Sequence, residues 1–542
     1  MINTRTDVLV IGAGGAACRA AIAAADAGAQ VMLATKKTIG KAGATTVPVA
    51  EMAGYNAADP TVPKDVEKHY EDIVAAGGGA ADERLAALLA EKAPETIDTL
   101  ESWGVEFEKE NGGYYVFQSC FSRWPRTHVI KGHGEPIVRA MAKQIALRTG
   151  IRVMEHITIT ELILEDGMCR GAAGWRKSES GEWESVRIFA GAVILATGGA
   201  CQAFERNMNP NDVSGDGYAL GEAAGARFTN MEFMQSGIGF SHPIVNMFNA
   251  YLWLGLPKLT NRDGETFLEK YLPKEWTPAE VMREHRKHFP FSSSDGSRYL
   301  EISVQKELLA GNGTDHGGVY ADLRNMTDDY VASLPDDCGI HHMWYLAKDF
   351  MKARGVDLLT DVPEIACFAH AINGGLKIDE NASTTVPGLY AAGETAGGPH
   401  GADRLGGNMM VTCQVFGAIA GESAAEWAKK NPPAETKKTS EQDVLWKKVD
   451  ADAMLAKLKA VNQKKLLICR REEGLKDILA NAANLQTELD KAGTDNRIHP
   501  ENFRLQSLIT STRLMAEAAL ARKESLGSHY REDETGSGNT NI

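Results

Sequence analysis

The sequence predicts an α/β protein with a Rossmann-like nucleotide-binding domain, an inserted α+β domain and a C-terminal helical domain. Apolar runs of strand length end in glycine-rich turns at 7–15, 190–200 and 386–398, which is typical of α/β nucleotide-binding folds. The stretch 237–355 is richer in Trp, Phe, His and Pro. After about residue 440, apolar residues recur every three or four positions, as in amphipathic helices.

Composition narrows the function classes. Apolar residues make up 43% of the 542 residues and charged residues 24%, which excludes disordered, collagen-like and coiled-coil proteins. The net charge of −14 argues against nucleic acid or an anionic membrane as the main partner. Residues 8–28 imitate a signal peptide, but glycines interrupt them, and no long apolar run follows, so we expect no direct membrane insertion.

The eight cysteines are scattered and include no CxxC pair. Iron–sulfur clusters and c-type haem need closely spaced cysteine ligands, so we expect neither group, and no metal site, in this chain. Scattered cysteines also fit a reducing compartment, and we expect a cytoplasmic protein.

The first element is a βαβ unit that places a pyrophosphate at a helix N-terminus. The strand DVLVI (7–11) leads into a turn with Gly12, Gly14 and Gly15, then an alanine-rich helix that ends at Gly28. Gly12 permits the tight turn, Gly14 and Gly15 let backbone N–H groups approach phosphate oxygens, and Ala17 keeps helix and strand close.

The second strand of this unit, at 29–35, ends differently from the strand in NAD-binding proteins. There, an acid about 20 residues after the first glycine contacts the ribose. Here Thr35 and Lys36 occupy that place. This departure favours FAD over NAD, with both residues beside the cofactor.

Two further segments repeat the pattern of strand and glycine turn. The first ends in Thr197-Gly198-Gly199, and Asp216 follows in a second turn, SGDG. The other, VPGLYAAGETAGG at 386–398, brings Gly393 and Glu394 to a strand end, where an acid accepts hydrogen bonds from ribose or ribityl hydroxyls. These segments predict one FAD-binding domain assembled from distant pieces.

The predicted domains follow from these patterns and from the linker KKNPPAETKKTSEQ at 429–442. We expect the FAD-binding domain at 1–236 and 356–430, the capping domain at 237–355, the helical domain at 440–531 and a flexible tail at 532–542.

The chain resembles the flavoprotein subunits of succinate dehydrogenase and fumarate reductase, a family that includes L-aspartate oxidase. The motifs run in family order through nearly the whole chain: GAGGAACRAA, LATGGA, SGDGYALGEAAGARFTNMEFMQ, GVYADL, VPGLYAAGE, HGADRLGGN and ESLGSHYRED. The segment HGADRLGGN at 400–408 is close to the family's HGANRLG and is the most specific of them.

This resemblance implies hydride transfer between flavin N5 and a small carboxylate. Arg404 matches the family's carboxylate-binding arginine, whose planar fork grips a carboxylate at two points. Arg298 matches the arginine assigned the proton transfer, and His370 matches a histidine that donates to the substrate carboxylate. His400 lies in the same motif as Arg404, with Gly407 and Asn408 beside the cofactor.

Three departures from the family pattern bear on the substrate and the cofactor. The family's EFxQxHPTG histidine is absent, because Ser236 and Gly237 follow Gln235; His242 could replace it only in a rebuilt loop. Asp403 replaces an asparagine beside Arg404, where it would favour a cationic or neutral substrate or pair with a basic residue. The stretch 40–54 contains no histidine for covalent attachment, so we expect noncovalent FAD.

The leading hypothesis is an FAD-dependent oxidoreductase of the fumarate reductase type, acting on a small carboxylate or a related unsaturated acid. We expect a separate iron–sulfur or ferredoxin-like partner to exchange electrons with it. Two alternatives stay open: an α subunit like that of adenylylsulfate reductase, and a noncatalytic flavin electron carrier.

Overall fold

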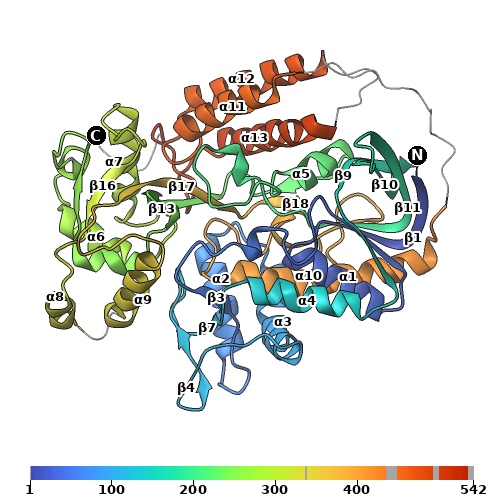
Figure 1. Cartoon of the computed structure of the whole chain (residues 1–542), viewed down its shortest axis with the longest axis horizontal. Coiled ribbons are helices and arrows are strands. Elements are labelled where there is room, and N and C mark those ends of the chain that lie inside the picture. The colour runs from blue at the N-terminus through green and yellow to red at the C-terminus, as the bar shows by residue number, and fades with distance from the viewer. Residues whose placement is uncertain (1, 336–338, 435–448, 492–499, 535–542) are drawn as a thin grey trace.

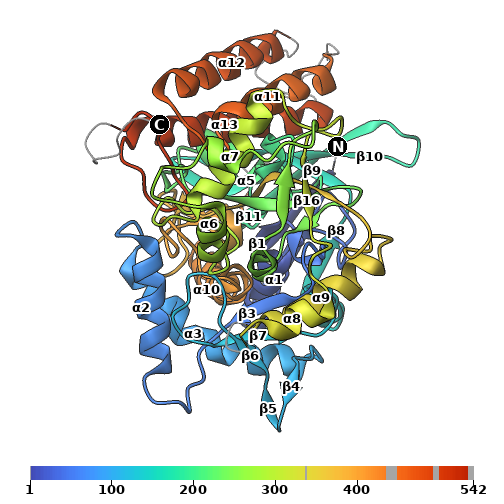
Figure 2. The same cartoon turned by 90° about the vertical axis from the view of Figure 1, so that its left-hand side faces the viewer.

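The computed structural model describes residues 2–335, 339–434, 449–491 and 500–534, so part of the expected linker and residues 535–542 of the expected tail lie outside it. A large sheet with its helices occupies one end of the long axis, and a second domain occupies the other end (Figure 1). Three C-terminal helices run along one side of both (Figures 1 and 2).

A seven-stranded sheet forms the centre of the first domain. β1 pairs in parallel with β2 on one side and with β11 on the other, and residues 8–11 of β1 and all of β2 are buried. Apolar strands buried on both faces are typical of parallel sheets covered by helices. In order across the sheet, the strands are β8 (Ile151–Met154), β2 (Val31–Ala34), β1 (Ile2–Ile11), β11 (Trp183–Leu195), β10 (Met168–Lys177) and β9 (Ile157–Glu165), with β19 (Leu389–Ala391) paired to the end of β11.

Helices α1 and α10 pack tightly against each other beside this sheet (Figure 1). Small residues allow the close approach: a Cβ atom added at Gly421 of α10 would lie 2.3 Å from the carbonyl oxygen of Ala20 in α1. The helices of this domain are α1 (Gly15–Asp26), α2 (Asp65–Gly77), α3 (Glu83–Ser102), α4 (Glu135–Ala146), α5 (Asp216–Ala223) and α10 (Asn408–Lys430).

Short strands and turns complete the first domain. They are β3 (Ala53–Asn56), β4 (Lys109–Glu110), β5 (Gly113–Tyr114), β6 (Val116–Phe117), β7 (Thr127–Ile130), β12 (Phe228–Thr229), β18 (Gly375–Lys377) and β20 (Ala396–Gly397), with 3-10 turns η1 (Ala44–Thr46), η2 (Cys201–Ala203) and η6 (Gly393–Thr395).

The inserted domain is built on a five-stranded sheet in the order β14-β13-β17-β16-β15, with antiparallel pairing throughout. Its elements are β13 (Met234–His242), β14 (Asn246–Met247), η3 (Ala250–Gly255), β15 (Lys258–Thr260), η4 (Leu268–Lys270), α6 (Pro278–His285), α7 (Arg298–Leu309), β16 (Val319–Asp322), α8 (Asp328–Ser333), α9 (Ile340–Lys352) and β17 (Glu364–Ile372). The sheet therefore reaches past both boundaries expected for this domain, at 237 and at 355, because the long pairing of β13 with β17 joins its two ends.

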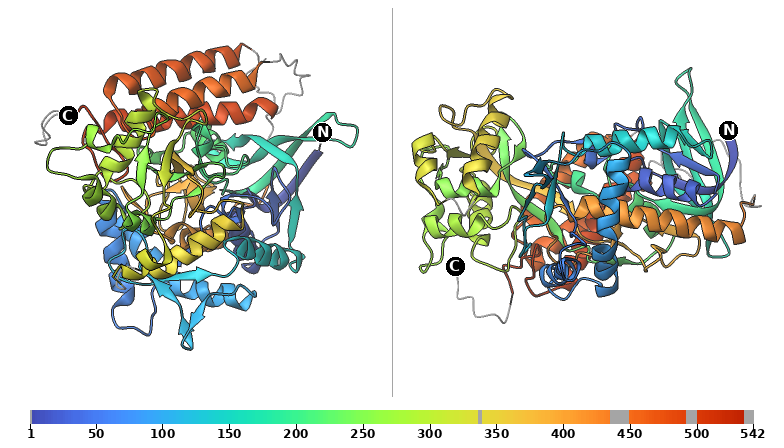
Figure 3. Two further views of the ribbon diagram at one scale, coloured as in Figure 1. Left: turned by 60° about the vertical axis from the view of Figure 1, so that its left-hand side comes forward. Right: turned by 90° about the horizontal axis from the view of Figure 1, so that it is seen from below.

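Most buried apolar residues of the C-terminal helices share a hydrophobic core with the inserted domain, whereas Phe503 packs in the core of the large sheet. They are α11 (Ala451–Lys465), α12 (Glu472–Asp490) and α13 (Phe503–Ala521), and the short η7 (Pro500–Asn502) precedes the last. Figure 3 shows them bundled side by side along the molecule. Across the described residues, no helix combines the length and the apolar character needed to span a membrane.

The end of the described chain is held by ion pairs. Glu532, at the start of the expected tail, pairs with Lys306 of α7 at 3.1 Å and with Arg471 at 2.9 Å. Asp533 pairs with Arg531 at 2.8 Å.

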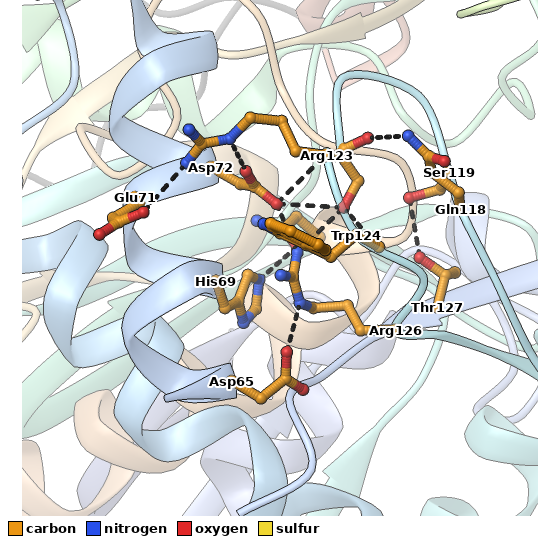
Figure 4. A network of polar contacts seen from close by, with 12 residues as sticks. Asp65, His69, Glu71, Asp72, Gln118, Ser119, Arg123, Trp124, Arg126 and Thr127 are labelled. Carbon is orange, nitrogen blue, oxygen red and sulfur yellow. Dashed lines mark hydrogen bonds and ion pairs between the residues drawn. The ribbon is translucent and has the colours of Figure 1, made fainter. Parts of the chain in front are cut away.

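A buried network of charges fixes the segment 117–127 of the first domain (Figure 4). The Arg126 guanidinium lies 2.7 Å from the Asp72 carboxylate, and both side chains are almost completely buried. Asp72 also accepts a hydrogen bond from Arg123 at 2.5 Å, and Asp65 lies 3.6 Å from Arg126. Next to this network, burial and then the Arg126 charge lower the pKa of His69 to about 4, so this imidazole is neutral.

The loop 400–404 of the first domain is tied to the inserted domain by Asp403. The buried Asp403 carboxylate accepts a hydrogen bond of 2.7 Å from the Ser292 hydroxyl, and among the described residues it forms no ion pair with a basic side chain. Burial raises the pKa of Asp403 to about 7, while the Ser292 hydrogen bond and then the His288 charge oppose the rise.

We predict that Asp72→Asn destabilises the protein strongly. The substitution keeps the size of the side chain but leaves the Arg126 charge buried with only the longer Asp65 contact, and breaking a buried pair costs about 3–5 kcal/mol. Thermal unfolding measures the effect. The control Glu71→Gln removes an exposed partner of Arg123, 3.2 Å away, and should cost less than about 1 kcal/mol. Equal melting temperatures for the two variants would contradict the prediction.

We predict that Asp403→Asn stabilises the protein in a pH-dependent way. Because the folded state holds the Asp403 proton more tightly than the unfolded chain, the wild type loses stability as pH rises from the unfolded pKa to the folded value. The neutral variant escapes this loss, so its gain in melting temperature should be larger at about pH 8 than at about pH 5. A gain that does not change with pH would show that Asp403 is not the titrating group.

Candidate functional site

A first cavity opens at the carboxyl ends of β1, β2 and β11. Nine of the predicted cofactor-binding residues line it: Gly12, Gly14, Gly15, Thr35, Lys36, Thr197, Gly198, Asp216 and Glu394. Ala17 lies buried directly behind the wall, where a Cβ atom added at Gly12 would be 3.4 Å from its methyl carbon. Three segments far apart in the sequence therefore meet at one site.

The N-terminus of α1 faces this cavity with its backbone N–H groups free of side-chain caps. Gly12 has a φ of +124°, and a Cβ atom there would lie 2.2 Å from the Ala196 carbonyl oxygen, so only glycine fits the turn. Uncapped N–H groups at a helix N-terminus, together with the helix dipole, suit a phosphate group. The site therefore fits the pyrophosphate of a dinucleotide.

Lys36 and Asp216 form an ion pair of 2.8 Å at the wall beyond β2. Ser214 accepts a hydrogen bond from Lys36 at 3.0 Å and donates one to Asp216 at 2.8 Å. Asp216, from the second segment, thus places a carboxylate near the end of β2, where the sequence itself has no acid. A carboxylate here can accept hydrogen bonds from ribose hydroxyls.

Glu394 joins the third segment to the second one and to the end of β17. Its carboxylate accepts hydrogen bonds from the backbone N–H of Gly199 at 3.0 Å and of Ile372 at 2.9 Å. Burial raises the pKa of Glu394, and the two N–H groups and then the Arg404 charge oppose the rise. Nearby, Gly393 has a φ of +67°, and a Cβ atom there would lie 2.7 Å from Ala16 of α1.

A second cavity, of about 330 Å³, adjoins the first. Both are lined by Ala44, Thr45, Glu394, Met409 and Cys413, so an extended dinucleotide can occupy the first and reach the second. The volume lies in the range of small-molecule sites. The second cavity sits between the two domains, because loops of the first domain and residues 247–251 and 286–290 of the inserted domain both line it.

Arg404 and His370 line the second cavity with unsatisfied nitrogen atoms. The Arg404 guanidinium is buried and donates to the Leu405 carbonyl at 3.0 Å, but its Nε has no hydrogen-bond partner among the described residues. Nor does Nδ1 of His370 within the same ranges. Burial and then the Arg404 charge lower the pKa of His370 to about 3, so its ring is neutral. Unpaired buried polar atoms are costly, and they point to a polar ligand.

The other predicted residues of the HGADRLGGN segment differ in whether they line the second cavity. Gly407 lines it, with a φ of +79° that favours glycine. Asn408 lies behind the wall, and its side-chain oxygen accepts a hydrogen bond of 3.1 Å from His69. His400 is buried and bonded to Thr412 at 3.2 Å, outside the lining. Its position suits orientation of the loop.

Arg298 is not among the residues that line either cavity. Its guanidinium donates to the Ser293 carbonyl at 2.7 Å and to the Tyr299 hydroxyl at 3.0 Å, and it lies over the Tyr299 ring. To transfer a proton to a ligand in the second cavity, this side chain would have to leave both partners.

His242 is also absent from both linings. It stacks on the His316 ring with centroids 3.6 Å apart, and His316 contacts Glu364 at 2.9 Å. The structure therefore does not place His242 where it could replace the family's missing histidine.

Sequence reasoning missed several polar residues of the second cavity, among them Glu51, Cys120, Arg286 and Lys287. Glu51 is the one acidic residue in the otherwise apolar run VPVAEMA, and such an isolated acid is a sequence pattern that could have indicated a functional residue. Arg286 and Lys287 are exposed charges in the turn after α6, and no sequence pattern separates such charges from ordinary surface residues.

Comparison with known families assigns both parts of the chain. The family model described as "FAD binding domain" matches residues 7–410, and the model described as "Fumarate reductase flavoprotein C-term" matches residues 455–541. The first of these alone covers well over half of the chain.

Individual proteins resemble the chain over nearly its full length. An uncharacterized FAD-dependent oxidoreductase of Methanocaldococcus jannaschii is 32% identical over 98% of this chain and 94% of that protein. A CoM/CoB fumarate reductase subunit of Methanothermobacter marburgensis is 31% identical over 97% of this chain and 94% of that protein.

Among solved structures, Sdh1 of Mycobacterium smegmatis in complex with UQ1 matches with a TM-score of 0.81 and 28% identity, over 98% of this chain and 90% of that one. The family models, the relatives and the fold agree with the geometry of the first cavity. The chain therefore belongs to the FAD-dependent oxidoreductases of the fumarate reductase and succinate dehydrogenase flavoprotein family, with FAD as its cofactor.

Proposed function

We propose that this protein transfers a hydride between FAD and a small carboxylate or a related unsaturated acid. The observation that carries the proposal is the pair of unsatisfied nitrogen atoms on Arg404 and His370, which line the second cavity beside the cofactor cavity. An anionic, hydrogen-bond-accepting ligand satisfies both atoms, and a carboxylate fits the planar fork of arginine.

The chain's own residues bind and orient the substrate in this proposal. Arg404 supplies a permanent positive charge, and the neutral His370 ring adds a hydrogen bond without a second charge. Both groups lie in a buried site where electrostatic interactions are stronger than in water. FAD, when bound, supplies the hydride acceptor or donor at flavin N5.

Exposed cations at the second cavity favour an anionic substrate. Arg286 and Lys287 belong to the lining and are open to solvent. Positive groups around a cavity raise the local concentration of anions and speed their entry.

We propose that an iron–sulfur or ferredoxin-like protein exchanges electrons with the bound cofactor. The names of the relatives support a partner, because one is a single subunit of a fumarate reductase. The cysteines also support a partner. The sequence contains no closely spaced set of cysteines that could hold a cluster, so an iron–sulfur cluster would belong to another chain.

We predict that FAD is bound noncovalently. The loop 40–54 lines both cavities and contains no histidine to form the covalent link. Denaturation with acid should therefore release all of the flavin into the supernatant and leave a colourless precipitate. An intact-protein mass that includes the flavin would contradict this prediction.

We predict that Arg404→Lys keeps FAD but lowers turnover with the carboxylate by at least about 100-fold, because a lysine point charge cannot reproduce the two-point grip of the guanidinium. The measurement is anaerobic: the protein is reduced chemically, fumarate or another small unsaturated carboxylate is added, and the return of the flavin absorbance is followed. Lysine retains the buried positive charge beside Glu394, so the fold should persist.

The matched control is Arg139→Lys, at an exposed position on α4, which should reoxidise at the wild-type rate. An Arg404→Lys variant that reoxidises as fast as this control would contradict the role of Arg404. Wild-type protein that is reoxidised by dyes or protein acceptors but by no carboxylate would instead favour an electron carrier. Reoxidation by adenylylsulfate alone would favour the reductase of that substrate.

A further inference from the structure

Glu51 places a buried carboxyl group on the wall of the second cavity. Its residue is 9% exposed, and its two carboxylate oxygens lie 3.3 Å from the side-chain amide nitrogens of Asn246 and Asn249, one each. Glu51 belongs to a loop of the first domain, whereas both asparagines belong to the inserted domain. The carboxylate therefore has a fixed position at the junction of the two domains.

The loop that carries Glu51 is itself anchored. The Met247 N–H donates to the Val49 carbonyl at 2.7 Å, next to Asn246. Asn249 is held from its other side, because its side-chain oxygen accepts a hydrogen bond from the Tyr251 N–H at 3.1 Å. Two amides held in this way fix the orientation of the carboxylate relative to the cavity.

The negative charge of Glu51 has no ion-pair partner among the described residues. The other buried acids of this part of the molecule differ: Asp72 contacts Arg126 directly, and Glu394 has two backbone N–H donors and the Arg404 charge. At Glu51, burial raises the pKa, while the backbone N–H of Glu51 itself, the two amides and the Arg354 charge oppose the rise. A buried carboxylate without a cation is costly, and a cation from a ligand would remove that cost.

The carboxylate also has room for more hydrogen bonds. Two carboxylate oxygens offer about four acceptor positions, of which the asparagines use two and the backbone N–H of Glu51 itself a third. The neighbouring lining residues Val47, Pro48, Val49 and Met52 have no charge to offer. Because Glu51 lines the cavity, a ligand bound there can supply the group that completes its contacts.

We propose that Glu51 is a specificity-determining residue that binds an ammonium group of the substrate, so that the substrate is a small carboxylate carrying an amine. The proposal rests on the proposed function for the carboxylate end, which Arg404 and His370 bind. The cavity then has an anion-binding pole and a cation-binding pole, and it selects molecules that carry both charges. A substrate without the amine leaves Glu51 unpaired, which is how one buried polar group discriminates between ligands.

Binding to the FAD-loaded protein tests the proposal with matched pairs of linear carboxylates that differ only in a terminal amine. The pairs run from acetate and glycine to hexanoate and 6-aminohexanoate, and aspartate and succinate are added as a pair of dicarboxylates. Ligand-induced changes in flavin absorbance give the dissociation constants. In the wild type, at least one pair should favour the amine by about tenfold or more, the size of a charge-assisted hydrogen bond.

Glu51→Gln should remove most of that preference and leave the affinity for the plain carboxylate within about threefold. Arg404→Lys should weaken both members of each pair, because it acts on the shared carboxylate. Glu91→Gln, at an exposed position on α3, is the matched control and should bind like the wild type. A melting temperature for Glu51→Gln close to that of this control shows that the loop has kept its fold, and Glu51→Asp offers a second, charge-retaining variant that should recover part of the preference.

The outcomes separate the two proposals. Carboxylates that bind with no preference for the amine, or with one that survives Glu51→Gln, overturn the role of Glu51 and leave the proposed function intact. Failure of every pair to bind overturns both. A Glu51→Gln variant that shifts the flavin spectrum or potential in the ligand-free protein, without changing selectivity, would show that Glu51 faces the cofactor and would also overturn the proposal.

Discussion

The central constraint in this molecule is the burial of a guanidinium, Arg404, beside a buried carboxylate, Glu394. Neither charge is solvated, so each depends on the other and on fixed hydrogen bonds. Glu394 meets this need with the N–H groups of Gly199 and Ile372, which come from the second nucleotide-binding segment and from the end of β17. The Glu394 carboxylate thus links the two domains at the site, near the buried Arg404 charge.

The same charge sets the state of the histidines around it. Burial and Arg404 together lower the pKa of His370 and of His400 to about 3. Both rings are therefore neutral at physiological pH, and a ligand in the second cavity meets one strong positive charge with a neutral hydrogen-bonding group beside it. With only one positive charge, the part of the cavity next to Arg404 favours the binding of one carboxylate group and not of two anionic groups.

The C-terminal segment supports the loop that carries Arg404. The Ser528 hydroxyl donates to the Ala402 carbonyl at 2.9 Å, and the Gly527 carbonyl accepts from the Ser293 N–H at 2.6 Å. Ser528 and Gly527 belong to ESLGSHYRED, the last of the family-like motifs in the chain. In this protein the motif connects the Arg404 loop to the inserted domain, so its sequence is constrained by contacts inside the chain.

Local patterns made the fold and half of the site predictable from sequence, whereas long-range packing decided the rest. The glycine turn at 12–15 and the strand ends at Thr197 and Glu394 follow from steric rules that act over a few residues, and the structure brings them together at the first cavity. Arg298 matched a motif, but its direction depends on Ser293 and Tyr299, which a motif does not describe. The carboxylate of Glu51 has its position in the site because Asn246 and Asn249, nearly 200 residues away in the sequence, donate hydrogen bonds to it.

The position of the second cavity explains why its chemistry was harder to foresee than that of the first. The first cavity is made by one domain, whose backbone geometry fixes the phosphate-binding turn. The second is made where two domains meet, and the inserted domain shares its core with the C-terminal helices, so those helices help to set the distance between its two walls. The shape of the second cavity therefore depends on packing between distant parts of the chain, whereas that of the first depends on turns within one domain.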